Sequence, residues 1–163
     1  MLAAIEAKIM TRTDLQAQCS GWKLLSQKMV FTNGVFDLMH RGHLTYLAQA
    51  RALGHRLIVG LNSDASVKRL GKGSDRPILS QADRAFQLAS LSCVDAVVIF
   101  DDDTPADLIQ TLLPDILVKG GDYTIDTVVG AGAVCESGGR VELIPFIDGY
   151  STTKLIEKIS GSI

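Results

Sequence analysis

Residues 29–61 read MVFTNGVFDLMHRGHLTYLAQARALGHRLIVGL, and this stretch decides the fold class. An apolar run, Met29-Val30-Phe31, leads into a polar loop, an amphipathic segment with Leu44 and Leu47, and a second apolar run at 57–61. Both runs are continuous rather than alternating in polarity, as in strands covered on both faces. A strand, a helix and a second buried strand form the repeating unit of a parallel sheet.

The same alternation continues through the rest of the 163 residues. Further apolar runs occupy 96–100, 116–118 and 141–144, and helix-start signals stand at Ser80 and at Thr104-Pro105. A leading helix is expected over 13–25. The sequence therefore predicts an α/β fold, a Rossmann-like doubly wound parallel sheet of five strands. We expect a single domain over 1–163, in which 1–27 form an N-terminal helical extension.

Composition excludes several classes of protein. Hydrophobic residues make up 47% and the net charge is −2, which argues against disorder and against a dedicated nucleic-acid binder. The three cysteines form no CxxC pair, so neither a disulfide scaffold nor a thiolate zinc site is expected. No run approaches the roughly 20 apolar residues of a membrane span, and charged residues interrupt the N-terminus. We expect a cytoplasmic protein with no membrane partner.

Ligands of doubly wound sheets bind beyond the carboxyl ends of the strands. Asn33 and Gly34 follow the first strand there, at a turn before a helix. His40 and His43 are three residues apart and face the same side of a helical turn, where imidazoles can donate to phosphate oxygens. Gly42 leaves room for a ligand to approach the backbone. The two histidines are equally compatible with part of a metal site, although no third ligand is near, or with ordinary helix-start residues.

Two further clusters follow the last two strands. Ser151 and Thr152, in Gly149–Lys154, can hold a phosphate at a helix start or merely cap the helix. Lys119 and Asp122 flank two glycines, and they are either ligands or solvated residues of a turn.

A fourth cluster begins after the second strand. Asn62-Ser63-Asp64 is a helix cap or a ligand group. The basic stretch that follows it either closes over phosphates or is a solvated face. Its cationic residues are Lys68, Arg69, Lys72 and Arg76.

Two of these clusters carry a family resemblance. Gly34-Val35-Phe36-Asp37 followed by His40-Arg41-Gly42-His43 resembles the GxFDxxHxGH motif of cytidylyltransferase-like nucleotidyltransferases of the HxGH type. The segment 149–153 is similar to the second motif of that superfamily. Segments 59–70, 117–123 and 128–131 are similar to one branch, the D-glycero-β-D-manno-heptose 1-phosphate adenylyltransferases, and the resemblance covers about 28–160.

The resemblance implies transfer of AMP from ATP to a sugar 1-phosphate in the synthesis of ADP-heptose for the lipopolysaccharide inner core. It implies Mg²⁺ bound to ATP rather than to a protein metal site, and a homodimer or larger homo-oligomer. The alternatives are a cytidylyltransferase acting on a polyol or amino-alcohol phosphate, and a nucleotide-binding module without activity.

The resemblance also implies a role for each matched residue. The residues implied in catalysis are His40, His43 and Lys72. Those implied in nucleotide binding are Asn33, Gly34, Phe36, Gly42, Arg84, Lys119, Gly149, Ser151 and Thr152. Those implied in binding the sugar phosphate are Asp37, Asn62, Asp64 and Asp122.

Overall fold

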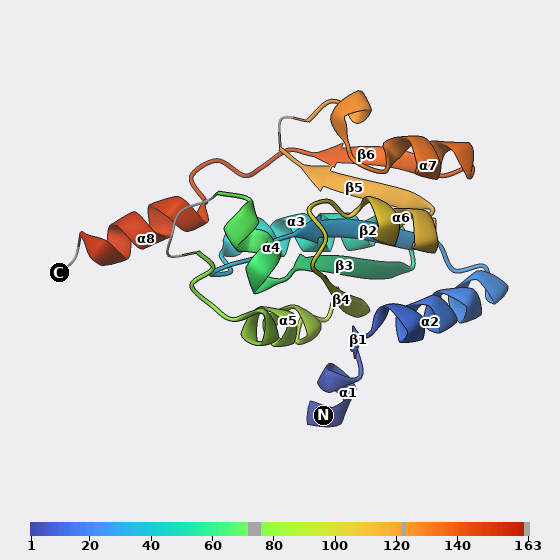
Figure 1. Cartoon of the computed structure of the whole chain (residues 1–163), viewed down its shortest axis with the longest axis horizontal. Helices are drawn as coiled ribbons and strands as arrows, with labels where there is room; N and C mark the ends of the chain where they lie inside the picture. The colour runs from blue at the N-terminus through green and yellow to red at the C-terminus, as the bar shows by residue number, and fades with distance from the viewer. Residues whose placement is uncertain (72–75, 122, 162–163) are drawn as a thin grey trace.

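The computed structural model describes residues 1–71, 76–121 and 123–161. Its centre is a parallel sheet of six strands in the order β1-β4-β3-β2-β5-β6 (Figure 1). The strands are β1 (Ile9–Met10), β2 (Met29–Gly34), β3 (Arg56–Asn62), β4 (Ala96–Phe100), β5 (Ile116–Gly120) and β6 (Arg140–Ile144).

The predicted parallel α/β sheet is confirmed, but the predicted count of five strands is wrong. The additional strand, β1, has two residues, which is too short to show a hydrophobic pattern. It lies at the sheet edge, where Ile9 pairs with Val97 and Met10 with Val98 of β4.

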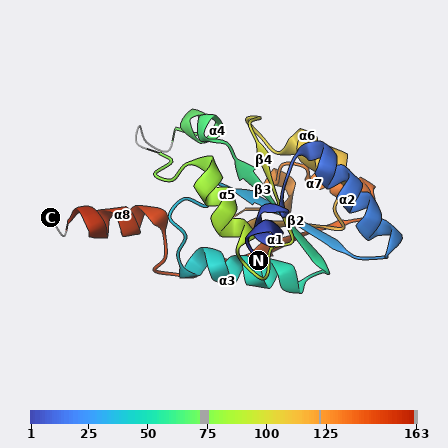
Figure 2. The ribbon, with the colours of Figure 1, turned by 90° about the horizontal axis from the view of Figure 1, so that it is seen from below.

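Helices cover both faces of the sheet, as Figures 1 and 2 show. One face carries α2, α6 and α7, and the other carries α1, α3 and α5. The helices are α1 (Leu2–Glu6), α2 (Arg12–Leu24), α3 (Arg41–Ala52), α4 (Asp64–Arg69), α5 (Gln81–Ala89), α6 (Ala106–Leu112), α7 (Ala131–Glu136) and α8 (Thr152–Ser160), with a 3₁₀ turn η1 (Ile125–Thr127). No helix within the described ranges is long and apolar enough to cross a bilayer.

The N-terminal helix α2 is packed into the domain. Thr11 caps it by accepting a hydrogen bond from the Asp14 N–H. Leu15, Cys19 and Trp22 recur at helical spacing and are buried in the core on the α6 and α7 face. Together with β1, this packing makes the N-terminal segment part of the sheet and its core, whereas the sequence predicts only a leading helix.

Two local predictions need correction. Pro105 is the N-cap of α6 rather than its first helical residue. In α3, Leu44 is 42% exposed, and the buried face is formed by Tyr46, Leu47 and Ala50. Of the predicted stripe of Leu44, Leu47 and Ala48, only Leu47 is buried, because α3 presents Tyr46 and Ala50 to the sheet.

The sheet changes winding direction at β2, which lies between β3 and β5. The β2–β3 pairing runs the full length of β2, to Gly34 opposite Leu61, whereas the β2–β5 pairs are those of Val30 and Phe31 with 116 and 117. Beyond Phe31 the buried Tyr46 connects the two strands. Its hydroxyl lies 2.7 Å from Thr32 Oγ1 and donates to the Val118 carbonyl at 3.3 Å. The fold therefore opens a crevice between the carboxyl ends of β2 and β5, where such sheets bind ligands.

Candidate active site

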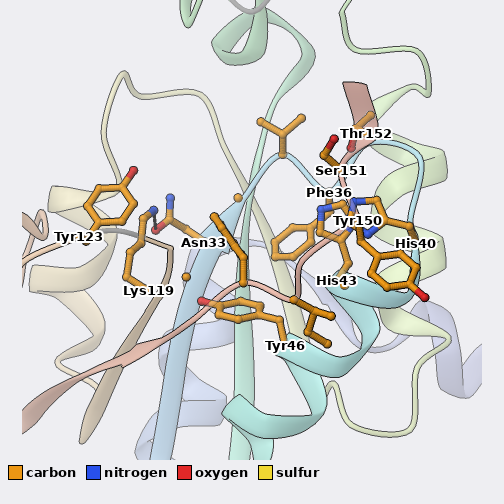
Figure 3. A pocket seen from close by; sticks show the side chains of 16 residues that line it. Asn33, Phe36, His40, His43, Tyr46, Lys119, Tyr123, Tyr150, Ser151 and Thr152 are labelled. Atoms are coloured by element: carbon orange, nitrogen blue, oxygen red, sulfur yellow. Dashed lines mark hydrogen bonds between the residues drawn. The ribbon is translucent and has the colours of Figure 1, made fainter. Parts of the chain in front are cut away.

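A cleft of about 420 Å³ occupies this crevice (Figure 3). It brings together nine of the residues predicted from the sequence: Asn33, Gly34, Phe36, His40, Gly42, His43, Lys119, Ser151 and Thr152. The remaining lining residues are Val35, Tyr46, Gly120, Tyr123, Phe146, Ile147 and Tyr150. One cavity is therefore lined by residues of both motifs, which lie more than 100 positions apart in the sequence.

The loop between β2 and α3 has an unusual backbone. Phe36 and Leu38 both adopt φ of 48°, in the left-handed region that non-glycine residues rarely occupy. Each such residue costs on the order of 1–3 kcal/mol, and such residues cluster at functional sites. The Phe36 ring turns back below Gly34, where an added Cβ would lie 3.0 Å from the ring, and it meets His43 edge-on at 5.4 Å. Phe36 therefore forms the packed floor beneath the histidines.

His40 and His43 form a stacked pair, with ring centroids 3.9 Å apart and planes inclined by 18°. Both Nδ1 atoms are buried and have no hydrogen-bond partner among the described residues. A bare ring nitrogen is cheaper to bury than an unpaired N–H, so the favoured tautomer carries its proton on Nε2.

Burial lowers the pKa of both imidazoles. It lowers the pKa of His43 to about 4, to which repulsion from His40 contributes and which attraction to Asp37 opposes. Burial likewise lowers the pKa of His40 below its ordinary value. Both rings are therefore neutral near pH 7.

Gly42 fits between these groups because it lacks a side chain. A Cβ there would lie 3.0 Å from the His40 ring and 3.1 Å from the Tyr150 Cβ. The sequence predicts that this space is left for a ligand, but His40 and Tyr150 fill much of it. Gly42 still lines the cleft.

The second motif enters the cleft at the start of α8. Ser151 is the N-cap and accepts a hydrogen bond from the Lys154 N–H at 3.1 Å, which confirms the capping interpretation. Thr152 donates through Oγ1 to the Asp37 carbonyl oxygen at 2.8 Å, joining the two motifs directly. Gly149, with φ of 88°, turns the chain into the helix in a conformation that glycine favours. It does not line the cleft.

The far end of the cleft is formed by β5 and aromatic side chains. Lys119 donates to Asn33 Oδ1 at 3.1 Å, and its Nζ lies 5.4 Å from the centre of the Tyr123 ring (Figure 3). The Phe146 ring lies against Gly120 and Gly121, where added Cβ atoms would come within 2.8 and 2.5 Å of it. These glycines therefore make room for an aromatic side chain.

Sequence reasoning predicted Phe36 but assigned no role to three other aromatic lining residues, Tyr46, Phe146 and Tyr150. Tyr46 lies in α3, whereas Phe146 and Tyr150 lie in the loop between β6 and α8, and no spacing rule connects that loop with α3. The run of glycines after β5 was the available signal, since a residue without a side chain marks a close approach of some other group.

Three predicted residues, Arg84, Asp64 and Asn62, make hydrogen bonds within the protein and do not line the cleft. Arg84 is fully buried and donates to the Asp64 carboxylate at 2.7 Å, to the Val35 carbonyl at 2.7 Å and to the Leu79 carbonyl at 3.1 Å. Asn62 donates to Ser66 Oγ at 2.9 Å. The structure therefore shows Arg84, Asp64 and Asn62 bonded within the protein and does not present them to the cleft.

Asp37 is also engaged inside the protein, with a side chain 1% exposed. Its carboxylate accepts hydrogen bonds from the N–H groups of Ile78 and Leu79, at 2.8 and 3.0 Å. Lys72 and Asp122, the other two predicted residues, lie outside the described residues.

A second cavity, of about 260 Å³, adjoins the cleft. Both are lined by Val35, Phe36, His43 and Thr152, and the second adds Asp37, Val67, Arg76 and Thr153. The shared residues include one histidine, His43 of the first motif, and one hydroxyl residue, Thr152 of the second motif. Two molecules bound side by side would therefore meet at His43 and Thr152.

The donor chemistry of the cleft suits phosphate oxygens. Imidazole, hydroxyl, ammonium and amide groups supply N–H and O–H donors there. In the described part of the chain, no group of three His, Cys, Asp or Glu side chains is placed to hold a metal ion.

A family profile described as cytidylyltransferase-like matches residues 31–163. The chain is 57% identical over 159 residues to the bifunctional protein HldE of Geotalea uraniireducens, covering 97% of this chain and 32% of that protein. It is 54% identical over 154 residues to HldE of Geobacter sulfurreducens, covering 94% and 31%. The chain therefore spans about a third of the length of these curated relatives.

A solved structure has the same fold. The lipopolysaccharide core biosynthesis protein from Thermoplasma volcanium superposes with a TM-score of 0.62 at 26% sequence identity. The match covers 77% of this chain and 99% of the other.

Proposed function

The chain belongs to the cytidylyltransferase-like family, and from that premise we propose that it transfers AMP from ATP to D-glycero-β-D-manno-heptose 1-phosphate. The products are ADP-heptose and pyrophosphate. The observation that carries this proposal is the stacked, neutral His40–His43 pair in a cleft that also receives the start of α8. Identity of 57% along nearly the whole chain to a bifunctional HldE protein supports the heptose branch.

The chemistry requires no nucleophile from the protein. An oxygen of the sugar phosphate attacks the α-phosphorus of ATP, and the bond between the α-phosphorus and the bridging oxygen of pyrophosphate breaks. The attacking oxygen already carries negative charge, so catalysis consists of positioning and charge stabilisation. The Nε2–H groups of His40 and His43 donate to phosphate oxygens as charge moves toward the leaving pyrophosphate.

The remaining lining residues hold the nucleotide. Ser151 and Thr152, at the N-terminus of a nine-residue helix, bind the β- and γ-phosphates. Lys119 and Asn33, already joined by a hydrogen bond, lie at the opposite end with Tyr123 and contact the nucleoside. The aromatic side chains at that end suit the face of a base.

Mg²⁺ enters as part of the substrate, bound to ATP. The triphosphate and water supply the oxygen ligands that Mg²⁺ prefers, and the cleft supplies mainly hydrogen-bond donors that complement them. The ion neutralises charge on the triphosphate during transfer.

The biological setting that we propose is the assembly of the lipopolysaccharide inner core in the cytoplasm. The similar solved structure from Thermoplasma volcanium is that of a lipopolysaccharide core biosynthesis protein, which supports this setting.

We also propose that the protein acts as a homodimer or larger homo-oligomer. Helix α8 projects from the rest of the molecule (Figures 1 and 2), and none of its residues is buried. Its side chains Leu155 and Ile156 are only half-buried and Ile159 is 56% exposed, which leaves an apolar face for a second copy. Light scattering after size exclusion tests this proposal, and a monomer at micromolar concentration would contradict it.

Pyrophosphate release tests the proposed function. ATP and CTP are each combined with Mg²⁺ and with heptose 1-phosphate, glycerol 3-phosphate or phosphoethanolamine. Release with ATP and heptose 1-phosphate alone is the expected result. Pyrophosphate release with CTP or with another acceptor would still support nucleotidyl transfer but would overturn the heptose assignment. A folded protein that binds ATP but is silent with every acceptor would favour a non-catalytic module.

A further inference from the structure

We propose that Arg76 binds the phosphate of the acceptor in the cavity beside the nucleotide cleft, and that Asp37 is the residue that positions it. The inference rests on the proposed nucleotidyl transfer, but it does not depend on which acceptor carries the phosphate. It assigns a binding role to one arginine of the basic stretch, and it replaces the sugar-binding role expected for Asp37.

Both oxygens of the Asp37 carboxylate accept hydrogen bonds from backbone groups inside the protein. Oδ2 accepts from the Ile78 N–H at 2.8 Å and Oδ1 from the Leu79 N–H at 3.0 Å, and the side chain is 1% exposed. Each oxygen therefore has a backbone donor, an arrangement that fixes the segment just after Arg76. A carboxylate held in this way serves as an anchor and is poorly placed to receive sugar hydroxyls.

Arg76 is held in place by the same anchor. Its Nη1 lies 3.5 Å from Asp37 Oδ2, and its Nη2 donates to Thr153 Oγ1 at 3.5 Å. The side chain is 16% exposed and lines the second cavity. A guanidinium has five N–H donors, so two long contacts leave donors available for a phosphate in that cavity.

The residues that line this cavity with Arg76 complement a phosphate. Thr153, which lines this cavity and not the cleft, stands in the first turn of α8, where the backbone N–H groups have no acceptor within the helix. His43 closes the cavity on the side that it shares with the cleft. A phosphate there would meet a cation, a hydroxyl and an imidazole in one cavity.

The position of this cavity favours the acceptor over the nucleotide. The aromatic end of the cleft, with Tyr123 and Phe146, suits a nucleoside, and Ser151 lines the cleft without lining the second cavity. In-line displacement places the attacking and leaving oxygens on opposite sides of the reacting phosphorus. With the nucleotide in the cleft and its α-phosphate at His43, the adjoining cavity is the space from which an acceptor oxygen can attack.

The test compares Arg76→Gln and Arg76→Lys with a matched control, Arg69→Gln. Arg69 belongs to the same basic stretch but pairs on the surface with Asp101 and Asp103. The Michaelis constant of the acceptor, kcat and the dissociation constant of ATP, by calorimetry, are measured for each variant. Thermal melting confirms that each variant is folded.

Arg76→Gln is expected to raise the Michaelis constant of the acceptor by about 10- to 100-fold, the range of one charged hydrogen bond, while ATP affinity changes less than about twofold. Arg76→Lys keeps the charge but loses the planar fork, so it should fall between wild type and Arg76→Gln. Arg69→Gln should behave as wild type. Asp37→Asn should raise the acceptor constant as Arg76→Gln does, because the guanidinium loses its anchor.

Two outcomes would overturn the assignment. Weaker ATP binding in Arg76→Gln with an unchanged acceptor constant would place the bound phosphate on the nucleotide. If Arg76→Gln changed neither the acceptor Michaelis constant nor the dissociation constant of ATP, Arg76 would not be a phosphate-binding residue.

The test also remains decisive if the heptose assignment fails. Activity with another phosphate acceptor gives the same comparison in that assay. If wild type is silent with every acceptor, inorganic phosphate is titrated onto protein saturated with a non-hydrolysable ATP analogue. Binding that Arg76→Gln weakens supports the assignment, and equal or absent binding overturns it.

Discussion

The Asp37→Asn substitution tests whether the Asp37 carboxylate anchors the backbone or binds the substrate. In the wild type its two oxygens accept from consecutive backbone N–H groups, at 2.8 and 3.0 Å. An asparagine offers one oxygen and one NH₂ group, so in either orientation a donor faces the N–H of Ile78 or Leu79. One charge-assisted hydrogen bond is lost, and the other becomes a neutral one.

The expected loss of stability follows from these contacts. A hydrogen bond to a charged group contributes about 1.5–3 kcal/mol and a neutral one about 1 kcal/mol, so Asp37→Asn should lower the free energy of unfolding by about 2–4 kcal/mol. Arg76, 3.5 Å away and mostly buried, loses its counter-charge as well. The total is a large share of the 5–15 kcal/mol typical of a domain.

Equilibrium unfolding in urea measures this loss, with Asp107→Asn as the matched control. Asp107 is exposed in the first turn of α6, so its substitution should cost less than about 0.5 kcal/mol. The midpoint for Asp37→Asn should fall while the slope stays constant. A variant as stable as Asp107→Asn that nevertheless loses sugar-phosphate affinity would refute the anchoring role and restore Asp37 as a ligand.

Four other perturbations test the site and its surroundings. His43→Ala should lower kcat/KM by about 10²- to 10³-fold, since a donor to developing charge is lost, with little change in the melting temperature; unchanged turnover would remove His43 from catalysis. Gly42→Ala places a Cβ 3.0 Å from the His40 ring and should lower kcat by about tenfold or more, and a fully active variant would show that the pair tolerates displacement. The folded-state pKa of His43 is lowered to about 4, so the stability from its neutral form is fully present above pH 6.5 and is lost as pH falls toward 4; the melting temperature of wild type should drop more over that window than that of His43→Gln. Asp95→Asn should cost about 1–3 kcal/mol in urea unfolding with kcat unchanged, because Asp95 accepts from two arginines and from the Leu57 N–H; lost activity at full stability would contradict its structural role.

Most of the sheet was predictable because buried parallel strands are continuous apolar runs. Strands β2, β3, β4, β5 and β6 coincide with the five runs in the sequence. The edge strand β1 was not predictable, since two residues cannot display a period and their pairing with β4 is a tertiary contact. The displaced face of α3 has the same origin, because the hydrogen bonds of Tyr46 to Thr32 and Val118 fix how the helix faces the sheet.

The site was predictable where residues close in sequence act together. His40 and His43 were expected on one side of a turn, and their rings stack. The sequence did not show which aspartate side chains contact ligands and which form hydrogen bonds within the protein. Asp37 and Asp64 each come shortly after a strand, but their partners, the Ile78 N–H and Arg84, lie 41 and 20 positions away. Such contacts depend on how loops from different strands pack together.

Isotope transfer tests the central claim, that this cleft performs nucleotidyl transfer, most directly. Parallel reactions contain Mg²⁺, heptose 1-phosphate and ATP labelled with ³²P at either the α- or the γ-phosphate, and the products are separated by chromatography. We expect the α-label in a nucleotide sugar and the γ-label in pyrophosphate, with both transfers slowed by about 10²- to 10³-fold in His43→Ala. A γ-label that appears on the sugar, or a label that stays in ATP while the protein binds both substrates, would contradict the claim.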